Sequence, residues 1–392
     1  MLPSPPVRPQ PRVSRRTAGL ALLFSLLACA PVLRAEEPSQ GLELTFSSPG
    51  ARSMGFAGAF APLVDDATAA FANPAGLVQL VRPEVSLELR LRGALESDEK
   101  GTSTLGAVNG VSFFSAVVPL GRWSFAVYGH QLATLEIERE DSPKAAGARL
   151  HAGGEERLAS LDVGRLGIAA GYQLRENLAL GVGVSHFAGT VGLAPLGTTG
   201  KAARTTESSD WGLNAGVLWR PSERLRLGGF FREGPSLDSG AVAAAPDSTS
   251  RTLQLPDSYG LGAAYRSRDG ALTLALEWDR VRYSRLRDGL AAIAGGDEGL
   301  AVGDADELHA GIEYAFLRVN PVLAVRAGAW LDPDHRACSS TPGSPYGCQA
   351  GGGDEVHLTA GFGMAFRRFQ LDVGIDQSRS QFAISLSAIV SF

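Results

Sequence analysis

The chain has 392 residues, of which 44% are hydrophobic and 20% charged, so it is long enough to enclose an interior and contains too little low-complexity sequence to be disordered. Its formal net charge is −5, but the first 35 residues hold five of the 36 basic residues and no acid, which leaves 31 basic against 41 acidic residues, a net charge of −10. A nucleic-acid partner, which needs a basic surface to neutralise phosphates, is therefore not expected.

Residues 1–35 are typical of a secretory signal peptide. Four arginines precede the apolar run AGLALLFSLLACAPVL, and small residues provide a cleavage site after Ala30 or after Ala35. The run is shorter than the ~20 residues that a membrane-spanning helix needs. We therefore expect removal of this segment rather than retention as an anchor.

Residues 36–82 are rich in glycine, alanine and proline and do not alternate between apolar and polar side chains. Asp65 or Asp66 can cap a short helix that runs to about Ala72, because a carboxylate accepts the free N–H groups at a helix start. Pro74 excludes Asn73 from the helical region. The sequence predicts a compact segment of turns and short helix ahead of the first strand.

From residue 83 onward, apolar and polar side chains alternate with a period of two, which is typical of strands with one apolar face. No apolar run reaches the length of a membrane helix, so a helical membrane protein is excluded, whereas a transmembrane barrel is not. In the clearest segment one face carries Phe382, Ile384, Leu386, Ala388, Val390 and Phe392. About fourteen segments share this pattern: 83–94, 109–119, 122–133, 160–174, 176–190, 209–220, 222–233, 253–267, 270–284, 305–317, 320–331, 354–366, 368–377 and 381–392.

The connections between these segments are alternately short and long. The long ones are 95–108, 134–159, 191–208, 234–252, 285–304 and 332–353. Short turns on one side and long loops on the other are typical of bacterial outer-membrane barrels. We therefore predict an all-β fold, a 14-stranded antiparallel transmembrane β-barrel over residues 83–392, with residues 36–82 inside its lumen as an N-terminal plug. A soluble all-β domain is the weaker alternative.

Aromatic residues gather at the predicted short-turn ends of the strands. They are Trp123, Tyr172, Trp219, Tyr265, Phe316, Phe366, Phe369 and Phe392, all with the apolar parity of their strands. Such a girdle marks a membrane interface, so outer-membrane lipid is an expected partner. The aromatic C-terminal residue Phe392 resembles the signal by which barrel-assembly machinery recognises its substrates.

The run GARSMGFAGAFAPLVDDATAAFANPAGL at 50–77 resembles the plug signature of the FadL/TodX family of outer-membrane transporters. The matching positions are Gly55, Gly58, Asp65, Asp66, Asn73, Pro74 and Ala75. LPDSYGLGAAYR at 255–266 is similar to later strands of that family. The resemblance implies passive uptake of hydrophobic molecules such as long-chain fatty acids or aromatic hydrocarbons. In that family the ligand is captured outside, passes a pocket near the plug and leaves sideways through the wall.

Charged and aromatic side chains at lumen-facing positions are the candidate ligand-binding residues. They are Arg90, His130, His309, Arg326, Trp330 and His357. Most lumen charges are expected to pair with opposite charges on neighbouring strands and to hold the plug. The sharper alternative is that Arg90 or Arg326 receives a ligand carboxylate, which a guanidinium binds well.

Neither an enzyme, nor a metal site, nor a cofactor is expected. No two of the six histidines share a metal-binding spacing on one strand face, and the best catalytic pair that the pattern offers is His309 with Asp279. The acidic residues between Asp297 and Glu307 suit a solvated loop better than a divalent ion. Cys338 and Cys348 are the only cysteines left after signal removal, and an oxidising compartment favours a structural disulfide between them.

Two functions fit these observations. The first is facilitated diffusion of small hydrophobic molecules across the outer membrane through a plugged barrel. The second is a PorV-type barrel of a secretion apparatus, which would dock proteins rather than pass solutes. An apolar capture surface and a continuous apolar path through the lumen would favour facilitated diffusion.

Overall fold

The computed structural model describes residues 49–94, 96–97, 103–104, 108–135, 148–152, 155–195, 204–238, 252–293, 299–340, 353–379 and 381–392. The predicted signal peptide and residues 36–48 lie outside these ranges. No helix among the described residues is long and apolar enough to cross a membrane.

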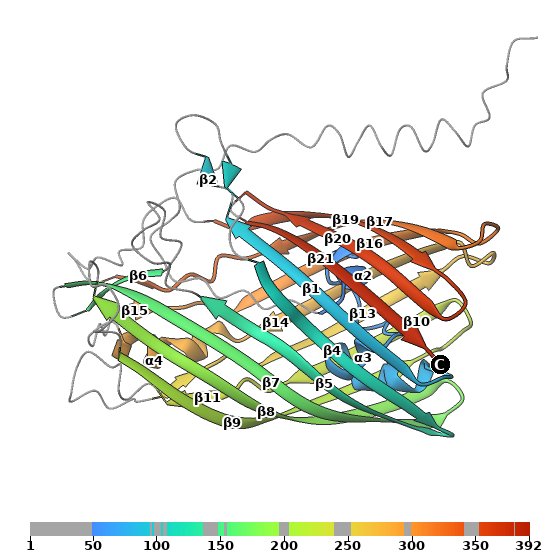
Figure 1. Ribbon diagram of the computed structural model, residues 1–392, viewed down its shortest axis with the longest axis horizontal. Helices are drawn as coiled ribbons and strands as arrows, with labels where there is room; N and C mark the ends of the chain where they lie inside the picture. The colour runs from blue at the N-terminus through green and yellow to red at the C-terminus, as the bar shows by residue number, and fades with distance from the viewer. Residues whose placement is uncertain are drawn as a thin grey trace, which may run out of the picture.

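Fourteen antiparallel strands form one closed ring (Figure 1). The ring closes because β5 pairs with β7 as well as with β4, while β1 pairs with β21 and so joins the two ends of the barrel sequence. The strands are β1 (Glu84–Ala94), β4 (Val108–Leu120), β5 (Trp123–Leu135), β7 (Glu155–Arg175), β8 (Leu178–Pro195), β9 (Arg204–Trp219), β10 (Leu225–Arg232), β13 (Ser258–Arg266), β14 (Leu272–Val281), β16 (Ala305–Phe316), β17 (Val322–Asp332), β19 (Glu355–Ala365), β20 (Phe369–Gln377) and β21 (Gln381–Ser391). The predicted 14-stranded antiparallel barrel is confirmed.

The alternation of side chains separates the two faces of the wall as predicted. In β21, Leu386 and Val390 point outward and are 43% and 41% exposed, whereas Ser385, which has the opposite parity, is fully buried. The same holds in β9, where Trp211, Leu213 and Trp219 are exposed and Asn214 is buried. None of the described elements covers this outward apolar face. It is therefore stable in lipid and unfavourable in water.

Four of the aromatic residues predicted for the short-turn ends lie in two close pairs. The rings of Trp123 and Tyr172 are 4.5 Å apart on the neighbouring strands β5 and β7. Those of Phe366 and Phe369 are 4.1 Å apart across the turn between β19 and β20. Such rings, apolar on the lipid side and polarisable at the headgroup level, suit a membrane interface.

The long-loop end carries structure of its own beyond the ring. It consists of β2 (Glu96–Ser97), β3 (Ser103–Thr104), β6 (Ala148–Ala152), β11 (Ser236–Asp238), β12 (Thr252–Gln254), the 3-10 helix η2 (Tyr283–Leu286), α4 (Arg287–Ile293), β15 (Leu300–Ala301) and β18 (Cys338–Ser339). Figure 1 shows α4, β11 and β15 at the end of the barrel opposite to the C-terminus. Buried apolar side chains from these elements, among them Leu237, Tyr283 and Leu290, form one cluster with the strand ends below them.

Two sequence expectations are corrected at this end. The predicted strand 253–267 is divided, because Thr252–Gln254 pairs with Ser236–Asp238 in a separate ribbon and β13 begins only at Ser258. Pro256 lies between the two pieces and has no N–H for a strand ladder. The predicted loop 285–304 contains α4 and β15 rather than loop alone.

Residues 49–80, here called the inner segment, lie inside the ring. The segment contains α2 (Ala51–Gly55), α3 (Ala69–Ala72) and the 3-10 helix η1 (Pro74–Gln79). α2 packs against β17, β19, β20 and β21, whereas η1 packs against β4, β5, β7, β8 and β9 on the other side of the lumen (Figure 1). The predicted domain boundaries at 36 and 82, and a role as a plug, remain predictions.

Glycine on the lumen face lets the inner segment approach the wall. The positions where Cβ atoms of Gly181 and Gly216 would stand are taken by Pro74 and by the Asn73 amide. Any larger side chain there would displace the segment, so these strand positions require glycine for close backbone approach. At these positions the shape of the barrel wall therefore matches the backbone of the inner segment closely.

Asn73 adopts the predicted extended backbone, with φ −161° and ψ 101°, immediately before Pro74. The prediction of the helix cap needs correction. Asp66 does accept the backbone N–H of Thr68 at 2.9 Å, but α3 begins only at Ala69, and Thr68 itself is its N-cap residue without a side-chain cap bond. Asp66 thus closes a turn ahead of a helix of four residues rather than capping a longer one.

Candidate functional site: a pocket above the inner segment

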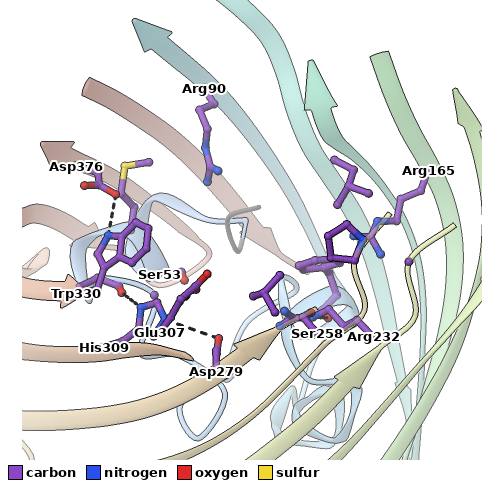
Figure 2. Close-up of a pocket in the computed structure, with 18 of the residues that line it drawn as sticks. Ser53, Arg90, Arg165, Arg232, Ser258, Asp279, Glu307, His309, Trp330 and Asp376 are labelled. Carbon is purple, nitrogen blue, oxygen red and sulfur yellow. Dashed lines mark hydrogen bonds and ion pairs between the residues drawn. The ribbon is translucent and has the colours of Figure 1, made fainter. Parts of the chain in front are cut away.

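A pocket lies between the inner segment and the long-loop end of the barrel (Figure 2). It holds ≈ 930 Å³ of space between protein atoms, its open side included. Its floor is formed by Ser53, Met54, Ala57, Gly58 and Phe71 of the inner segment. Its walls come from the strands and strand ends, with Arg90, Leu132, Arg165, Phe187, Arg232, Glu233, Gly234, Pro256, Ser258, Asp279, Val281, Glu307, His309, Trp330 and Asp376.

One side of the pocket is basic and aromatic. The Arg165 guanidinium lies 4.1 Å from the centre of the Phe71 ring and 5.1 Å from that of Phe187. The Arg232 guanidinium lies 4.5 Å from the Phe71 ring and donates to the carbonyl oxygens of Phe71 and Ala72. Arg165 is thus held against aromatic faces, and Arg232 is held by an aromatic face and backbone carbonyls.

Neither of these two guanidinium groups is paired with a carboxylate among the described residues, which contain no ion pair of either arginine. Arg165 also has a buried Nε–H without a hydrogen-bond partner. A buried cation without a counter-ion is costly, and a ligand that brings an anionic or π-electron-rich group would relieve this cost.

The opposite side of the pocket is acidic. Asp279, Glu307 and His309 point toward one another in Figure 2, and one ligand-type atom from each lies within 4.8 Å of the others. The register of β14 and β16 explains the meeting, because Asp279 pairs with Glu307, and His309 follows two residues later on the same face. The sequence predicts no metal site and favours a solvated loop for Glu307, whereas the structure places Glu307 in β16, where it is 6% exposed.

Trp330 separates the pocket from a second histidine. Its ring stacks on His309 at 5.4 Å and on His357 at 4.0 Å, and its Nε1 donates to Asp376 at 3.2 Å. Asp376 also contacts Nδ1 of His357 at 2.9 Å. This packing fixes the indole against the acidic side of the pocket.

The predicted ligand-binding residues divide into two groups. Arg90, His309 and Trp330 line the pocket, whereas His130, Arg326 and His357 do not. Arg326 is held between Glu313 and Asp372, at 2.7 Å from each, and only 3% of its side chain is exposed. Arg90 is ion-paired with Glu88 at 2.7 Å. Arg326 is thus paired with acids on other strands of the wall, whereas Arg90 is paired with an acid on its own strand, β1. Ligand binding by either arginine stays a prediction.

All seven positions of the predicted plug motif lie within the inner segment. Arg52 joins the segment to the wall, since it pairs with Asp65 of the segment and, at 3.4 Å, with Glu313 of β16. Wall carboxylates hold further N–H groups of the segment: Glu88 accepts from Gly50 at 2.8 Å, and Glu277 accepts from Ala61 at 2.7 Å.

The charges around Asp65 change its acidity. Burial by itself would raise the pKa of this carboxyl, but the guanidinium groups of Arg52 and Arg226 outweigh burial and lower the pKa. Asp66 has the opposite balance, because burial dominates and raises its pKa despite Arg52 and the hydrogen bonds from Thr68. Asp65 is therefore the ionised partner in the contact between the inner segment and the wall.

The sequence pattern does not identify Arg165, Arg232, Phe71 or Phe187 as residues of the site. The two arginines have lumen parity, but the sequence does not reveal that the described residues offer them no carboxylate partner.

The predicted disulfide involves the long-loop end of the barrel. Cys338 is disulfide-bonded, but Cys348 lies outside the described residues, so the pairing of the two stays a prediction.

Fold and surface together define the class of protein. A closed antiparallel barrel satisfies all backbone hydrogen bonds without an edge, and an outward apolar band between aromatic rings suits it to lipid. Even strand number, short turns at one end and long loops at the other are features of bacterial outer-membrane barrels. The chain is a multi-pass β-barrel of the bacterial outer membrane.

Solved structures with the same fold agree with this class. The structure of the toluene transporter TodX from Pseudomonas putida shares 16% sequence identity with this chain over 89% of its length and 99% of that protein's, with a TM-score of 0.56. A TodX monoaromatic hydrocarbon channel mutant, deltaS2S3, shares 17% identity over 88% and 98% of the two lengths, with a TM-score of 0.54. The resemblance to TodX extends over nearly the whole fold. No protein-family model and no curated protein sequence matches the chain.

Proposed function

We propose that the protein is a passive outer-membrane transporter of small hydrophobic molecules, with long-chain fatty acids and aromatic hydrocarbons as the substrate classes. The main observation behind this proposal is the pocket above the inner segment. It combines apolar walls such as Leu132, Phe187 and Val281 with two arginines, Arg165 and Arg232, for which the described residues provide no carboxylate partner. The shared fold with TodX, described as a toluene transporter, supports the proposal.

In this proposal Phe71 and Arg165 provide the binding groups. An aromatic or alkyl ligand would bury its surface against Phe71 and Phe187, which contributes about 25 cal/mol for each Å² removed from water. A carboxylate, where the ligand carries one, would bind the Arg165 guanidinium through charge-assisted hydrogen bonds. Leu132, Phe187 and Val281 of the pocket wall belong to the buried apolar cluster at the long-loop end, so the apolar wall continues into that cluster.

The inner segment acts in this proposal as the plug. It separates the pocket from the short-turn end, because α2 and η1 fill the lumen from opposite walls. To leave the pocket on the inner side, a ligand then requires either a displacement of the inner segment or an opening in the barrel wall.

We propose an exit through the wall between β1 and β4. Their pairing shifts register twice, between Glu88 and Leu89 and between Leu89 and Leu91. Gly110 of β4, with φ +73°, lies within this irregular stretch. Arg90, on the β1 side of the same stretch, lines the pocket, so the wall is least regular where it adjoins the pocket.

The experiment is ligand binding by the detergent-purified full chain. Titration with a fluorescent fatty acid should give saturable binding that toluene or unlabelled fatty acid displaces, and mass spectrometry should find co-purified lipid. Ser258→Trp, which fills the pocket, should abolish binding, whereas Ser222→Trp in an exposed short turn should not. Absence of binding and of co-purified lipid would refute the transport proposal and favour the PorV-type protein-docking alternative.

A further inference from the structure

The acidic side of the pocket has the features of a metal-binding site. Nε2 of His309 lies 3.4 Å from a Glu307 carboxylate oxygen and 3.9 Å from one of Asp279. Two ligands held by one tetrahedral metal ion at ~2.1 Å lie ~3.4 Å apart. The observed separations therefore suit a common metal ion with a small inward movement of Asp279.

The hydrogen bond on the other side of the His309 ring orients this histidine as a ligand. Its Nδ1 lies 2.7 Å from the carbonyl oxygen of Ala57, which can only accept, so Nδ1 carries a proton. In the neutral ring Nε2 then bears the lone pair. A backbone carbonyl that holds one ring nitrogen while the other binds the ion is the usual arrangement of metal-ligating histidines.

Two buried polar atoms of the site have no hydrogen-bond partner. They are Nε2 of His309, whose side chain is 8% exposed, and Oδ1 of Asp279. Buried polar groups in folded proteins are almost always satisfied, so an unsatisfied nitrogen aimed between two carboxylates points to a bound species. Figure 2 shows all three side chains directed at one point beside the inner segment.

The charge balance also favours a cation. Asp279, Glu307 and the neighbouring Glu277 are three carboxylates in the wall, where Glu277 already accepts the N–H of Ala61. Arg232, the nearest cation across the pocket, forms no ion pair with any described carboxylate. A divalent ion would neutralise the charges of Asp279 and Glu307 without adding a buried excess charge.

We propose that Asp279, Glu307 and His309 bind one divalent transition-metal ion, with Zn²⁺ as the best fit. An imidazole nitrogen beside two carboxylates selects ions such as Zn²⁺ over Mg²⁺ and Ca²⁺, which take oxygen ligands only. All three side chains line the pocket, so a further ligand of the ion would come from the pocket side. Because His309 holds Ala57, the ion would also fix the inner segment to β14 and β16. This site is independent of the proposed transport function.

The test uses the full chain without a polyhistidine tag, purified in detergent, stripped with chelator and equilibrated with Zn²⁺ or Co²⁺. We expect one Zn²⁺ per chain by elemental analysis, a rise in thermal stability with Zn²⁺ but not with Mg²⁺, and a visible absorption band with Co²⁺. H309Q, E307Q and D279N should each lower metal affinity at least tenfold.

Two control variants separate this site from unspecific binding. His186→Gln removes a histidine that meets Trp211 edge to face, away from the site, and Asp306→Asn removes an exposed acid beside the site. Both variants should bind Zn²⁺ as the parent does. Heat-modifiable migration in chelator shows which variants are folded. Equal Zn²⁺ content in the parent and in folded H309Q would overturn the proposal. So would a parent that binds no Zn²⁺, which would leave His309 as the cation of an ion pair with Glu307.

Discussion

The side-chain amide of Asn73 joins the inner segment to the wall of the barrel, since its nitrogen donates to the carbonyl oxygen of Val217 in β9 at 3.0 Å. The same nitrogen donates to Ala61 within the inner segment, and the amide oxygen accepts the N–H of Ala75. One fully buried side chain thus holds two turns of the segment and one strand together.

Replacement of Asn73 by alanine should loosen the inner segment while the barrel still forms. The change leaves the carbonyl oxygens of Ala61 and Val217 and the N–H of Ala75 without these partners, and each unsatisfied buried group costs about 1–3 kcal/mol. Conductance of the variant in planar bilayers should rise above that of the parent. Gln79→Ala, which removes hydrogen bonds to Leu63 and Val64 within the inner segment and leaves the Asn73 bond to the wall intact, is the control. An unchanged conductance with Asn73→Ala would show that Asn73 does not hold the segment in place.

A valine at Gly171 should displace the inner segment from the wall. A Cβ atom there would lie 2.8 Å from the carbonyl oxygen of Pro74, whereas one at Gly164 of the same strand would meet nothing within 4 Å. We expect Gly171→Val to make the inner segment sensitive to added protease in detergent, with Gly164→Val resistant like the parent. Equal protease resistance of the two variants would contradict the close fit described above.

The barrel is predictable from sequence because its determinants are local. In 381–392 the side chains alternate with the strand period, and that alone assigns the strand and its lipid face. The extended backbone of Asn73 follows equally directly from Pro74. The ribbon of β11 and β12 was missed, because it depends on which distant segment Thr252–Gln254 meets rather than on its own pattern.

The pocket is harder to predict because closure of the ring brings its residues together. Phe71 and Arg165 meet only when the inner segment enters the lumen. Glu307 was assigned to the neighbouring acidic loop, although its spacing of two from His309 places both on one face of a strand that was predicted to start at 305. That spacing was a usable signal. The lack of a carboxylate partner for Arg165 among the described residues could not be predicted, since it depends on the side chains of several neighbouring strands at once.

Asp65→Asn should destabilise the protein in a pH-dependent way. The pKa of Asp65 is lowered in the folded protein, so its contacts with Arg52 and Arg226 stabilise the fold above the unfolded-state value of about 3.9 and are lost as the pH falls through the folded-state pKa. The variant should lose about 1–3 kcal/mol at pH 7 and progressively less below pH ~4. Thermal unfolding in detergent across this range measures the difference. Asp288→Asn, at an exposed site in α4, should have no comparable effect; a loss for Asp65→Asn that persists undiminished at the lowest pH would refute the ionic explanation.

Gly110→Val should slow transport without weakening binding. Gly110 has φ +73°, a region that a β-branched residue avoids, so valine would favour a regular strand across the shifted pairing of β4 with β1. Uptake of a labelled fatty acid by cells should fall severalfold, while the affinity of the purified variant stays within about twofold of the parent. The control is Gly303→Val, since a Cβ atom there also meets nothing within 4 Å but lies outside the barrel wall. Unimpaired uptake by Gly110→Val would place the exit elsewhere.

Arg165→Gln should separate acidic ligands from neutral ones. The guanidinium stacks on Phe71 and has no carboxylate partner among the described residues, so its loss removes the charge offered to a ligand carboxylate and keeps most of the apolar wall. Hydrogen bonds to charged groups contribute about 1.5–3 kcal/mol, which corresponds to a ~10–150-fold weaker affinity for a fatty acid. Affinity for toluene should change far less, by the cation–π contribution alone. Arg280→Gln, whose guanidinium pairs with Asp304 and Asp306 rather than lining the pocket, should leave both affinities unchanged. If Arg165→Gln lowered the affinities for the fatty acid and for toluene equally, the arginine would act through the shape of the pocket and not through its charge.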